Sequence, residues 1–62
     1  MRHFVAELDP DGEEGFTVLR LTDENGNDGT WLVERSRHFA DLAELEAALA
    51  AELGTAVTVE EA

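Results

Sequence analysis

The segment DENGNDG, residues 23–29, concentrates oxygen-bearing side chains of the kind that bind calcium. A calcium loop of the EF-hand type takes ligands from positions 1, 3 and 5, has glycine at position 6, and has a bidentate Glu at position 12. Counted from the first residue, the ligands would be Asp23, Asn25, Asn27 and Glu34. Position 6 is Asp28 instead of glycine, and the following residues have strand character where the motif needs a helix. A second acidic segment, DPDGEEG at residues 9–15, fails because its position 12 is Arg20.

The same two segments contain the residues of tight turns. Pro10 fixes one backbone dihedral, the glycines admit positive φ, and Asn or Asp tolerates the left-handed region. Each segment also stands between two runs with strand character. We therefore interpret both as hairpin connections, and we expect neither a specific metal site nor a cofactor.

Two further groups have residue types suited to chemistry but lack the placement. Ser36, His38 and Asp41 are the types of a hydrolytic triad, yet they lie within six consecutive residues, whereas tertiary structure brings triad members together. His3 and His38 are of a type that binds zinc, but we interpret both as surface residues. A chain of 62 residues also has little room for a substrate pocket. We expect no catalytic residue and no enzymatic activity.

The charge of the chain narrows the choice of partners. Fifteen Asp and Glu stand against four Arg and no Lys, so the formal net charge is −11. This charge opposes direct binding to nucleic acid or to an anionic membrane. The chain has no cysteine, which excludes disulfides and thiolate zinc sites. No stretch approaches the roughly 18 apolar residues of a membrane span, and the start, MRHFVAELDP, lacks the apolar run of a signal peptide, so we expect a cytoplasmic location.

Three runs predict strands. Residues 3–8 have the two-residue period of a strand, and residues 15–22 are rich in aromatic and β-branched residues. The second run has apolar side chains of both parities, which predicts a strand covered on both faces, with a bulge as the device that would switch the pattern. Residues 29–35 predict a third strand. We expect Trp31 in the core under a helix and Phe39 packed at the entrance of that helix.

Residues 41–54, DLAELEAALAAELG, predict this helix. Asp41 is placed to cap the first turn while Glu44 reaches back, and Gly54 offers a left-handed stop. The apolar stripe is formed by Leu42, Leu45, Leu49 and Leu53. Residues 57–59 resume the alternation and predict either a short fourth strand or a frayed end. For this single domain, residues 1–62, the expected fold class is therefore α+β, an antiparallel three-stranded meander with the helix packed on one face (β-β-β-α).

One helix covers only one face of such a sheet. The apolar side chains expected on the opposite face are Val5, Leu32 and either Leu19 with Leu21 or Phe16 with Val18. Exposed apolar surface of this kind marks an interaction site. We therefore expect a homodimer joined through the helix-free face of the sheet.

The order of the expected strands HFVAEL, GFTVLRLT and GTWLVER, followed by the helix DLAELEAALAAEL, resembles the β-β-β-α arrangement of HicB-like antitoxin domains and of the arm-binding domains of tyrosine integrases. The resemblance is one of element order and hydrophobic pattern. The first family has a Pro- and Gly-rich segment before the helix, which this chain lacks, and the second family is basic. No functional residue is transferred from either.

These observations favour a binding protein over an enzyme. We expect a small regulator or inhibitor that docks on a basic protein surface, one form of which is a nucleic-acid mimic of the anti-restriction or anti-CRISPR kind. Its contacts would be acidic residues of the two turns and of the outer helix face, namely Asp9, Asp11, Glu13, Glu14, Asp23, Glu24, Asp28, Glu44, Glu46 and Glu52. An alternative is that the acidity adapts a homodimeric domain, antitoxin-like in element order, to the molar salt of a halophile's cytoplasm.

Overall fold

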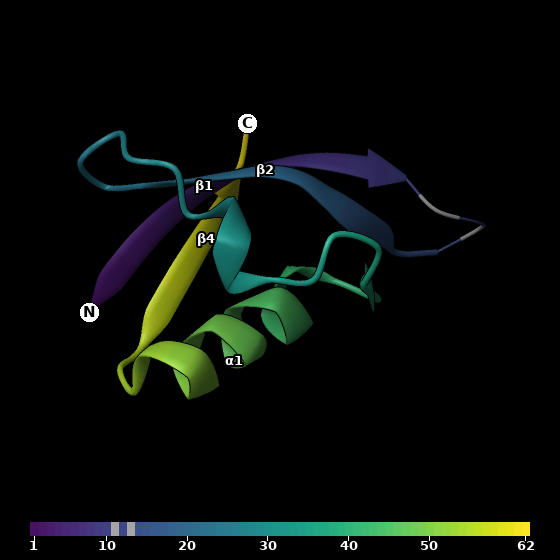
Figure 1. Cartoon of the computed structure of the whole chain (residues 1–62). Helices are drawn as coiled ribbons and strands as arrows, with labels where there is room; N and C mark the ends of the chain where they lie inside the picture. Colours follow the sequence, from purple (N-terminus) through teal and green to yellow (C-terminus); the bar gives the residue numbers. More distant parts are fainter. Residues whose placement is uncertain (11, 13) are drawn as a thin grey trace.

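The computed structural model describes residues 1–10, 12 and 14–62 and has an α+β fold with one helix packed on one face of a four-stranded sheet (Figure 1). The elements along the chain are β1 (Arg2–Pro10), β2 (Phe16–Asp23), the 3₁₀ helix η1 (Thr30–Leu32), β3 (His38–Phe39), α1 (Leu42–Leu53) and β4 (Val57–Glu61). The strand order is β3-β2-β1-β4, in which β2 is antiparallel to both neighbours and β4 is parallel to β1. The α+β class is confirmed, but the sheet is mixed and four-stranded, so the expected purely antiparallel three-stranded meander is wrong.

β1 and β2 form the predicted hairpin, and a bulge explains the mixed parity of apolar residues in β2. The register shifts between Glu7 and Leu8 of β1, which leaves Leu19 of β2 without a partner. The extra residue switches the alternation of side chains. Val18 before the bulge and Leu21 after it are therefore both buried, while Leu19 is 62% exposed. The expected bulge is confirmed, and burial of β2 on both faces is wrong.

The predicted strand over residues 29–35 is wrong, because this segment begins with η1. Thr30 Oγ1 accepts a hydrogen bond from the backbone N–H of Leu21 at 2.9 Å and donates to Asp28 Oδ1 at 2.6 Å. The N–H of Gly29 donates to the carbonyl of Leu21 at 2.7 Å. A side chain thus takes the place along β2 that backbone pairing with a third strand would have taken. The third strand that does form, β3, has only two residues.

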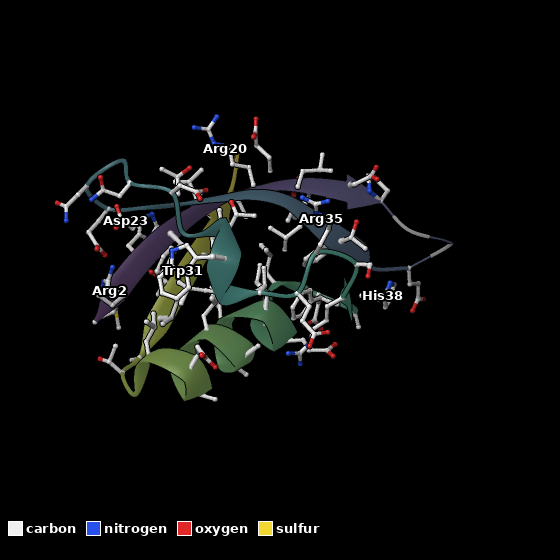
Figure 2. The ribbon with its side chains drawn as sticks, in the orientation of Figure 1. Arg2, Arg20, Asp23, Trp31, Arg35 and His38 are labelled. Carbon is white, nitrogen blue, oxygen red and sulfur yellow. The ribbon has the colours of Figure 1, made fainter. Side chains whose placement is uncertain are left out.

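Trp31 is not part of the core, so its expected place under the helix is wrong. Its side chain projects from η1 and is 74% exposed (Figure 2). Strand alternation does not apply in a 3₁₀ turn, and Leu32 and Val33 are the residues of this region that pack against the core. Phe39 is buried, as predicted, and its ring stacks on that of Phe16 with 5.9 Å between centroids.

α1 confirms the predicted helix and both of its ends. Asp41 Oδ1 accepts from the N–H of Glu44 at 2.9 Å, and Glu44 Oε2 accepts from the N–H of Ala40 at 2.9 Å. This reciprocal pair satisfies donors at the start of the helix in the manner of a capping box. At the other end Gly54 adopts a φ of 71°, and its N–H donates to the carbonyl of Ala50 at 2.8 Å. A side chain at this left-handed position would be strained, which explains the glycine.

The apolar stripe of α1 closes the core over the sheet. Leu45 and Leu49 at its centre are fully buried, and Leu42 and Leu53 at its ends are partly buried against them. The buried hydrophobic residues are Phe4, Ala6, Phe16, Val18, Leu21, Phe39, Leu45, Leu49, Val57 and Val59. No polar or charged side chain of a described residue is buried. Stability therefore rests on a small apolar core and on hydrogen bonds at the surface.

The C-terminal run forms β4, and its direction follows from the helix. β3 is antiparallel to β2 and β2 is antiparallel to β1, so β3 runs parallel to β1 and to β4. α1 is therefore the crossover between two parallel strands at opposite edges of the sheet. Its 12 residues span about 18 Å, which exceeds the roughly 14 Å between the outer strands of four. A meander makes no such crossing, and this is why the expected arrangement lacked a parallel pair.

Replacing Trp31 with Ala is expected to lower the free energy of unfolding by less than about 1 kcal/mol, because the indole is mostly solvated. Replacing Phe39 with Ala is expected to cost about 3–5 kcal/mol, since it removes a buried ring. Urea unfolding followed by far-ultraviolet circular dichroism measures both losses. A larger loss for Trp31→Ala than for Phe39→Ala would contradict the exposed position of the indole.

Candidate functional site

The acidic residues predicted to bind a partner do not gather at one place. Phe4 near the start of β1 pairs with Asp23, so the turn after β2 lies at the opposite end of the sheet from the β1–β2 connection (Figure 1). The structure places Asp9 and Glu14 at the first end, Asp23, Glu24 and Asp28 at the second, and Glu44, Glu46 and Glu52 on α1. Asp11 and Glu13, which were predicted with them, lie outside the described residues.

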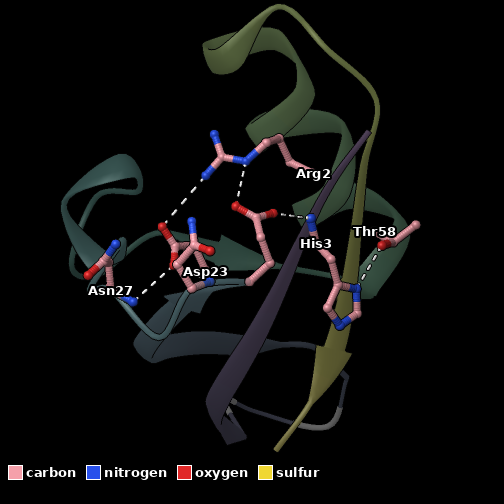
Figure 3. Close-up of polar contacts among 7 residues, drawn as sticks. Arg2, His3, Asp23, Asn27 and Thr58 are labelled. Carbon is pink, nitrogen blue, oxygen red and sulfur yellow. Dashed lines mark hydrogen bonds and ion pairs between the residues drawn. The ribbon is translucent and has the colours of Figure 1, made fainter.

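The turn after β2 is built around the carboxylate of Asp23 (Figure 3). Its Oδ1 accepts from the N–H groups of Asn25 and Asn27, both at 2.9 Å. Gly26 closes the turn at a φ of 82°, a value that favours glycine. The Oδ1 atom that was considered as a calcium ligand is thus occupied by two backbone donors, and Oδ2 faces a guanidinium nitrogen of Arg2 at 3.6 Å. The turn interpretation of this segment is confirmed.

Glu24 ties this turn to the first strand. Its Oε1 accepts from Arg2 Nε at 2.8 Å, and its Oε2 accepts from the backbone N–H of His3 at 2.9 Å (Figure 3). The hydrogen bond from the His3 backbone, helped by Arg2, lowers the pKa of Glu24 below its ordinary value of 4.5. β2 ends one residue before Glu24, so a side chain supplies an acceptor to β1 beyond the end of the paired strand.

Asp28 holds the entry to η1. Its Oδ1 accepts from the hydroxyl of Thr30 at 2.6 Å and from the N–H of the same residue at 3.3 Å. These two bonds, with the hydroxyl as the larger cause, lower the pKa of Asp28 below its ordinary value of 3.8. Residues 23–28 therefore form a tight turn, but they connect β2 to η1. The expected hairpin to a third strand is wrong here.

The three helix carboxylates have different surroundings. Glu44 belongs to the N-terminal cap of α1. Glu46 was predicted on the solvent side, but its Oε2 accepts from the backbone N–H of Val59 at 2.7 Å, so that placement is wrong. β4 is an edge strand, and a carboxylate beside its N–H both satisfies the donor and places a charge on the edge. Glu52 is exposed, and its carboxylate makes no hydrogen bond or ion pair to another described residue.

The predicted contact residues thus divide by whether the fold uses their carboxylates. Asp9, Glu14 and Glu52 are exposed, and their carboxylates have no hydrogen bond or ion pair to another described residue. The carboxylates of the 23–28 turn, and those of Glu44 and Glu46, hold backbone groups in place. The first group is therefore the more available to a partner, and the second is the more rigid.

Two of the residues considered for metal binding or hydrolysis, Asp41 and His3, have contacts within the fold. Within residues 1–10, 12 and 14–62, no group of three or more His, Asp or Glu side chains is arranged to hold a metal ion. Asp41 caps α1. The ring of His3 shares a hydrogen bond between Nδ1 and Thr58 Oγ1 at 2.9 Å (Figure 3). Its Nε2 lies 4.0 Å from a carboxylate oxygen of Glu60. These contacts connect β1 to β4 at the surface.

The face of the sheet opposite α1 has fewer apolar side chains than expected. Leu21 belongs to the core and Leu32 packs against it, so neither contributes to this face. Val5 is half-buried, and the residues paired with it are Thr22 on β2 and Glu60 on β4. Of the two alternative pairs, Phe16 and Val18 are also in the core, whereas Leu19 is exposed. A homodimer through the helix-free face stays a prediction, and Val5 and Leu19 are the apolar residues that remain from the expected set.

The chain was compared with known proteins. Comparison with protein families, with curated proteins and with solved structures finds no match. The β-β-β-α order behind the resemblance to antitoxin and integrase modules also changes, since η1 stands in the place of the expected third strand. Among the described residues, no helix has the length and apolar character needed to cross a membrane.

Sequence reasoning missed Trp31 as an exposed apolar group and Glu46 as the acceptor at the β4 edge. Leu19, by contrast, was one of the alternatives for the uncovered face of the sheet, and it is exposed. One local signal was present for Trp31. Asp28 is followed two residues later by Thr30, a spacing at which an Asp side chain bonds the backbone and forms a turn. If this spacing had been interpreted as a turn, residues 29–35 would not have been assigned to a strand. The contact made by Glu46 had no such signal, because it depends on the tertiary position of β4.

Replacing Glu46 with Ala is expected to lower the free energy of unfolding by about 1–2 kcal/mol, because the N–H of Val59 loses a charged acceptor. Glu52→Ala is the matched control. It removes one charge from the same helix and no hydrogen bond, so its effect should stay within about 0.5 kcal/mol. Urea unfolding near neutral pH measures both. Equal effects of the two substitutions would show that the bond to Val59 contributes nothing beyond its charge.

Replacing Glu24 with Gln is expected to change how stability depends on pH. Because folding lowers the pKa of Glu24, its carboxylate stabilises the fold above the ordinary value of 4.5, and this contribution is lost as the pH falls through the lowered folded value. The stability difference between the natural chain and Glu24→Gln should therefore be constant near neutral pH and shrink below pH 4.5. Urea unfolding from about pH 7 to 3 measures it, with Glu52→Gln as the control for loss of one charge. An unchanged difference across this range would contradict the role of ionised Glu24.

Proposed function

We propose that the chain is a small, acidic, non-enzymatic binding protein that docks on a basic surface of another protein and regulates or inhibits it. One form of this function is occupation of a nucleic-acid-binding groove by imitation of the phosphate backbone, as anti-restriction and anti-CRISPR proteins do. The expected partner is cationic. The net charge of −11 opposes direct binding to nucleic acid and to anionic membranes.

The observation that carries the proposal is that the negative charge is turned outward. No polar or charged side chain of a described residue is buried, so the carboxylates stand at the surface. A net charge of −11 over a longest extent of 31 Å is about one charge per 2.8 Å. DNA carries about one charge per 1.7 Å of helix axis. The two densities agree within about a factor of two, so a groove that attracts DNA would also attract this chain.

The 23–28 turn offers the most rigid part of this surface. Backbone hydrogen bonds fix the carboxylates of Asp23, Glu24 and Asp28 before any partner arrives. Groups that are already ordered lose less conformational entropy on binding, which favours affinity. Arg2 offsets part of the charge of the first two. At the other end of the sheet Asp9 and Glu14 add carboxylates that have no hydrogen bond or ion pair to another described residue.

A second candidate function class explains the same charge by habitat. A surface with fifteen acids and no lysine repels itself, and molar salt screens such repulsion. In this case the acidity adapts the domain to a salt-rich cytoplasm and does not identify a partner. The two candidates differ in how the folded chain responds to salt.

Binding to a cationic partner is expected to weaken steeply with salt, since the Debye length falls from about 10 Å at 0.1 M to 3 Å at 1 M. The immobilised chain should retain a basic nucleic-acid-binding protein from a cell extract in dilute KCl, and release it at high KCl or to competing duplex DNA. The triple variant Asp9→Asn, Glu14→Gln, Glu52→Gln should raise the Kd about tenfold or more. The matched control Glu7→Gln, Glu60→Gln, Glu61→Gln removes the same number of charges from β1 and β4.

Three outcomes would count against the proposal or part of it. If no basic protein is retained in dilute KCl, the proposed binding function is contradicted. If the two triple variants weaken binding equally, attraction is general and the assigned acidic residues are not the contact. A melting temperature that climbs continuously into molar KCl, without any retained partner, would favour the habitat explanation.

A further inference from the structure

An Asn followed by a Gly lies at the exposed side of the 23–28 turn. Asn25 and Gly26 are both exposed, and the carboxamide of Asn25 has no hydrogen bond to another described residue. Asn25 takes part in the turn only through its backbone N–H, which donates to Asp23 Oδ1 at 2.9 Å. The fold therefore holds the main chain at this point and leaves the carboxamide side chain unengaged.

This pair of residues contains both reactants of an intramolecular reaction. When the amide nitrogen of Gly26 loses its proton, it can attack Cγ of Asn25, because glycine has no side chain to obstruct the approach. A bond forms between that nitrogen and Cγ, and the bond from Cγ to the side-chain nitrogen breaks, so that ammonia leaves and a succinimide ring remains. Water then opens the ring. The overall change consumes water, releases ammonia and requires no oxidant or reductant.

The ring can open at either of its carbonyls. Opening at Cγ restores the normal main chain and leaves aspartate at position 25. Opening at the main-chain carbonyl leaves isoaspartate, in which the chain continues through the former side chain. Both products carry a carboxylate where Asn25 had a neutral carboxamide.

The structure distinguishes this pair from its neighbours in the turn. Asn27 precedes Asp28, whose side chain obstructs attack by its own amide nitrogen and whose negative charge disfavours loss of the amide proton. Asp28 precedes Gly29, but Gly29 is buried and its N–H donates to the carbonyl of Leu21 at 2.7 Å. Within this turn, an unengaged carboxamide and an exposed, unobstructed amide nitrogen meet at residues 25 and 26.

One hydrogen bond of the turn opposes the reaction. The N–H of Gly26 donates to the carbonyl of Asp23 at 3.0 Å, and this bond must open before the nitrogen can approach Cγ. The net contribution of one such bond corresponds to a reactive population lower by about tenfold at most. Apart from its chain neighbours, no described heavy atom lies within 4 Å of the position of a Cβ at Gly26. Packing therefore adds no further restraint.

We propose that Asn25 and Gly26 form a self-modification site, at which the folded chain converts Asn25 to aspartate and isoaspartate. Either product adds one negative charge to the turn that contains Asp23, Glu24 and Asp28, so the net charge changes from −11 to −12. The inference goes beyond the proposed function and does not rest on it.

The isoaspartate product also changes the geometry of the turn. The N–H groups of Asn25 and Asn27 both donate to Asp23 Oδ1 at 2.9 Å (Figure 3). Isoaspartate adds a methylene to the main chain between these two donors. The lengthened segment does not keep both bonds to one oxygen atom, so a rigid turn becomes a loose one as the molecule ages.

Mass spectrometry of the folded full-length chain, incubated in mildly alkaline buffer and then digested with trypsin, tests the proposal. Cleavage after Arg20 and Arg35 releases residues 21–35 as one peptide, which contains both Asn25 and Asn27. The mass gain of an amide-to-acid conversion should appear at Asn25, and Asn27 is the internal control. Electron-transfer fragmentation distinguishes aspartate from isoaspartate, and both should be present. An unincubated sample corrects for conversion during digestion.

The rate of conversion at Asn25 should rise with pH, because loss of the Gly26 amide proton starts the reaction. It should be at most about tenfold lower than in the same chain unfolded in concentrated urea, since one hydrogen bond must open. A folded chain that reacts more slowly than this would overturn the proposal. So would equal conversion at Asn27, or a rate that does not change with pH.

Asn25→Asp is the matched variant for the change in geometry, because it adds the same carboxylate without the methylene. Amide hydrogen exchange at Asn27 should be about tenfold faster in the isoaspartyl chain than in Asn25→Asp, the factor expected for one lost hydrogen bond. Equal exchange in the two forms would contradict the loosening of the turn. Circular dichroism verifies that each form keeps the fold.

Discussion

Backbone N–H groups that no strand or helix satisfies meet a carboxylate at several points of this fold. Asp23, Glu24, Asp41 and Glu46 each accept from such a group at 2.7–2.9 Å. A domain of 62 residues has a small margin of stability, and a backbone donor left without an acceptor costs about 1–3 kcal/mol. The turn after β2, the start of α1 and the edge of β4 therefore all depend on ionised carboxylates. The acidity of the chain is in part a structural property.

The structural role of these carboxylates separates two sources of the negative charge. A carboxylate that accepts from a backbone N–H keeps its charge, so a structural acid still contributes to the surface field. Its presence, however, is explained by the fold and needs no partner. Asp9, Glu14 and Glu52 lack this explanation, since their carboxylates bond to no other described residue. These acids therefore carry more weight for partner binding than the more numerous acids of the turn.

The parts of the structure that the sequence predicts are those with a local signal. The helix over residues 41–54 contains its cap, its apolar stripe and its stop within one segment, and all three were predicted. The predicted strand over residues 29–35 does not form, because Thr30 hydrogen-bonds to Asp28 and to β2 in place of regular strand pairing. The parallel pair of β1 and β4 joins the two ends of the chain, and no local pattern encodes it. In the candidate site, the sequence could identify the acidic residues. It could not predict that Glu46 bonds to β4, because that contact depends on the pairing of β1 with β4.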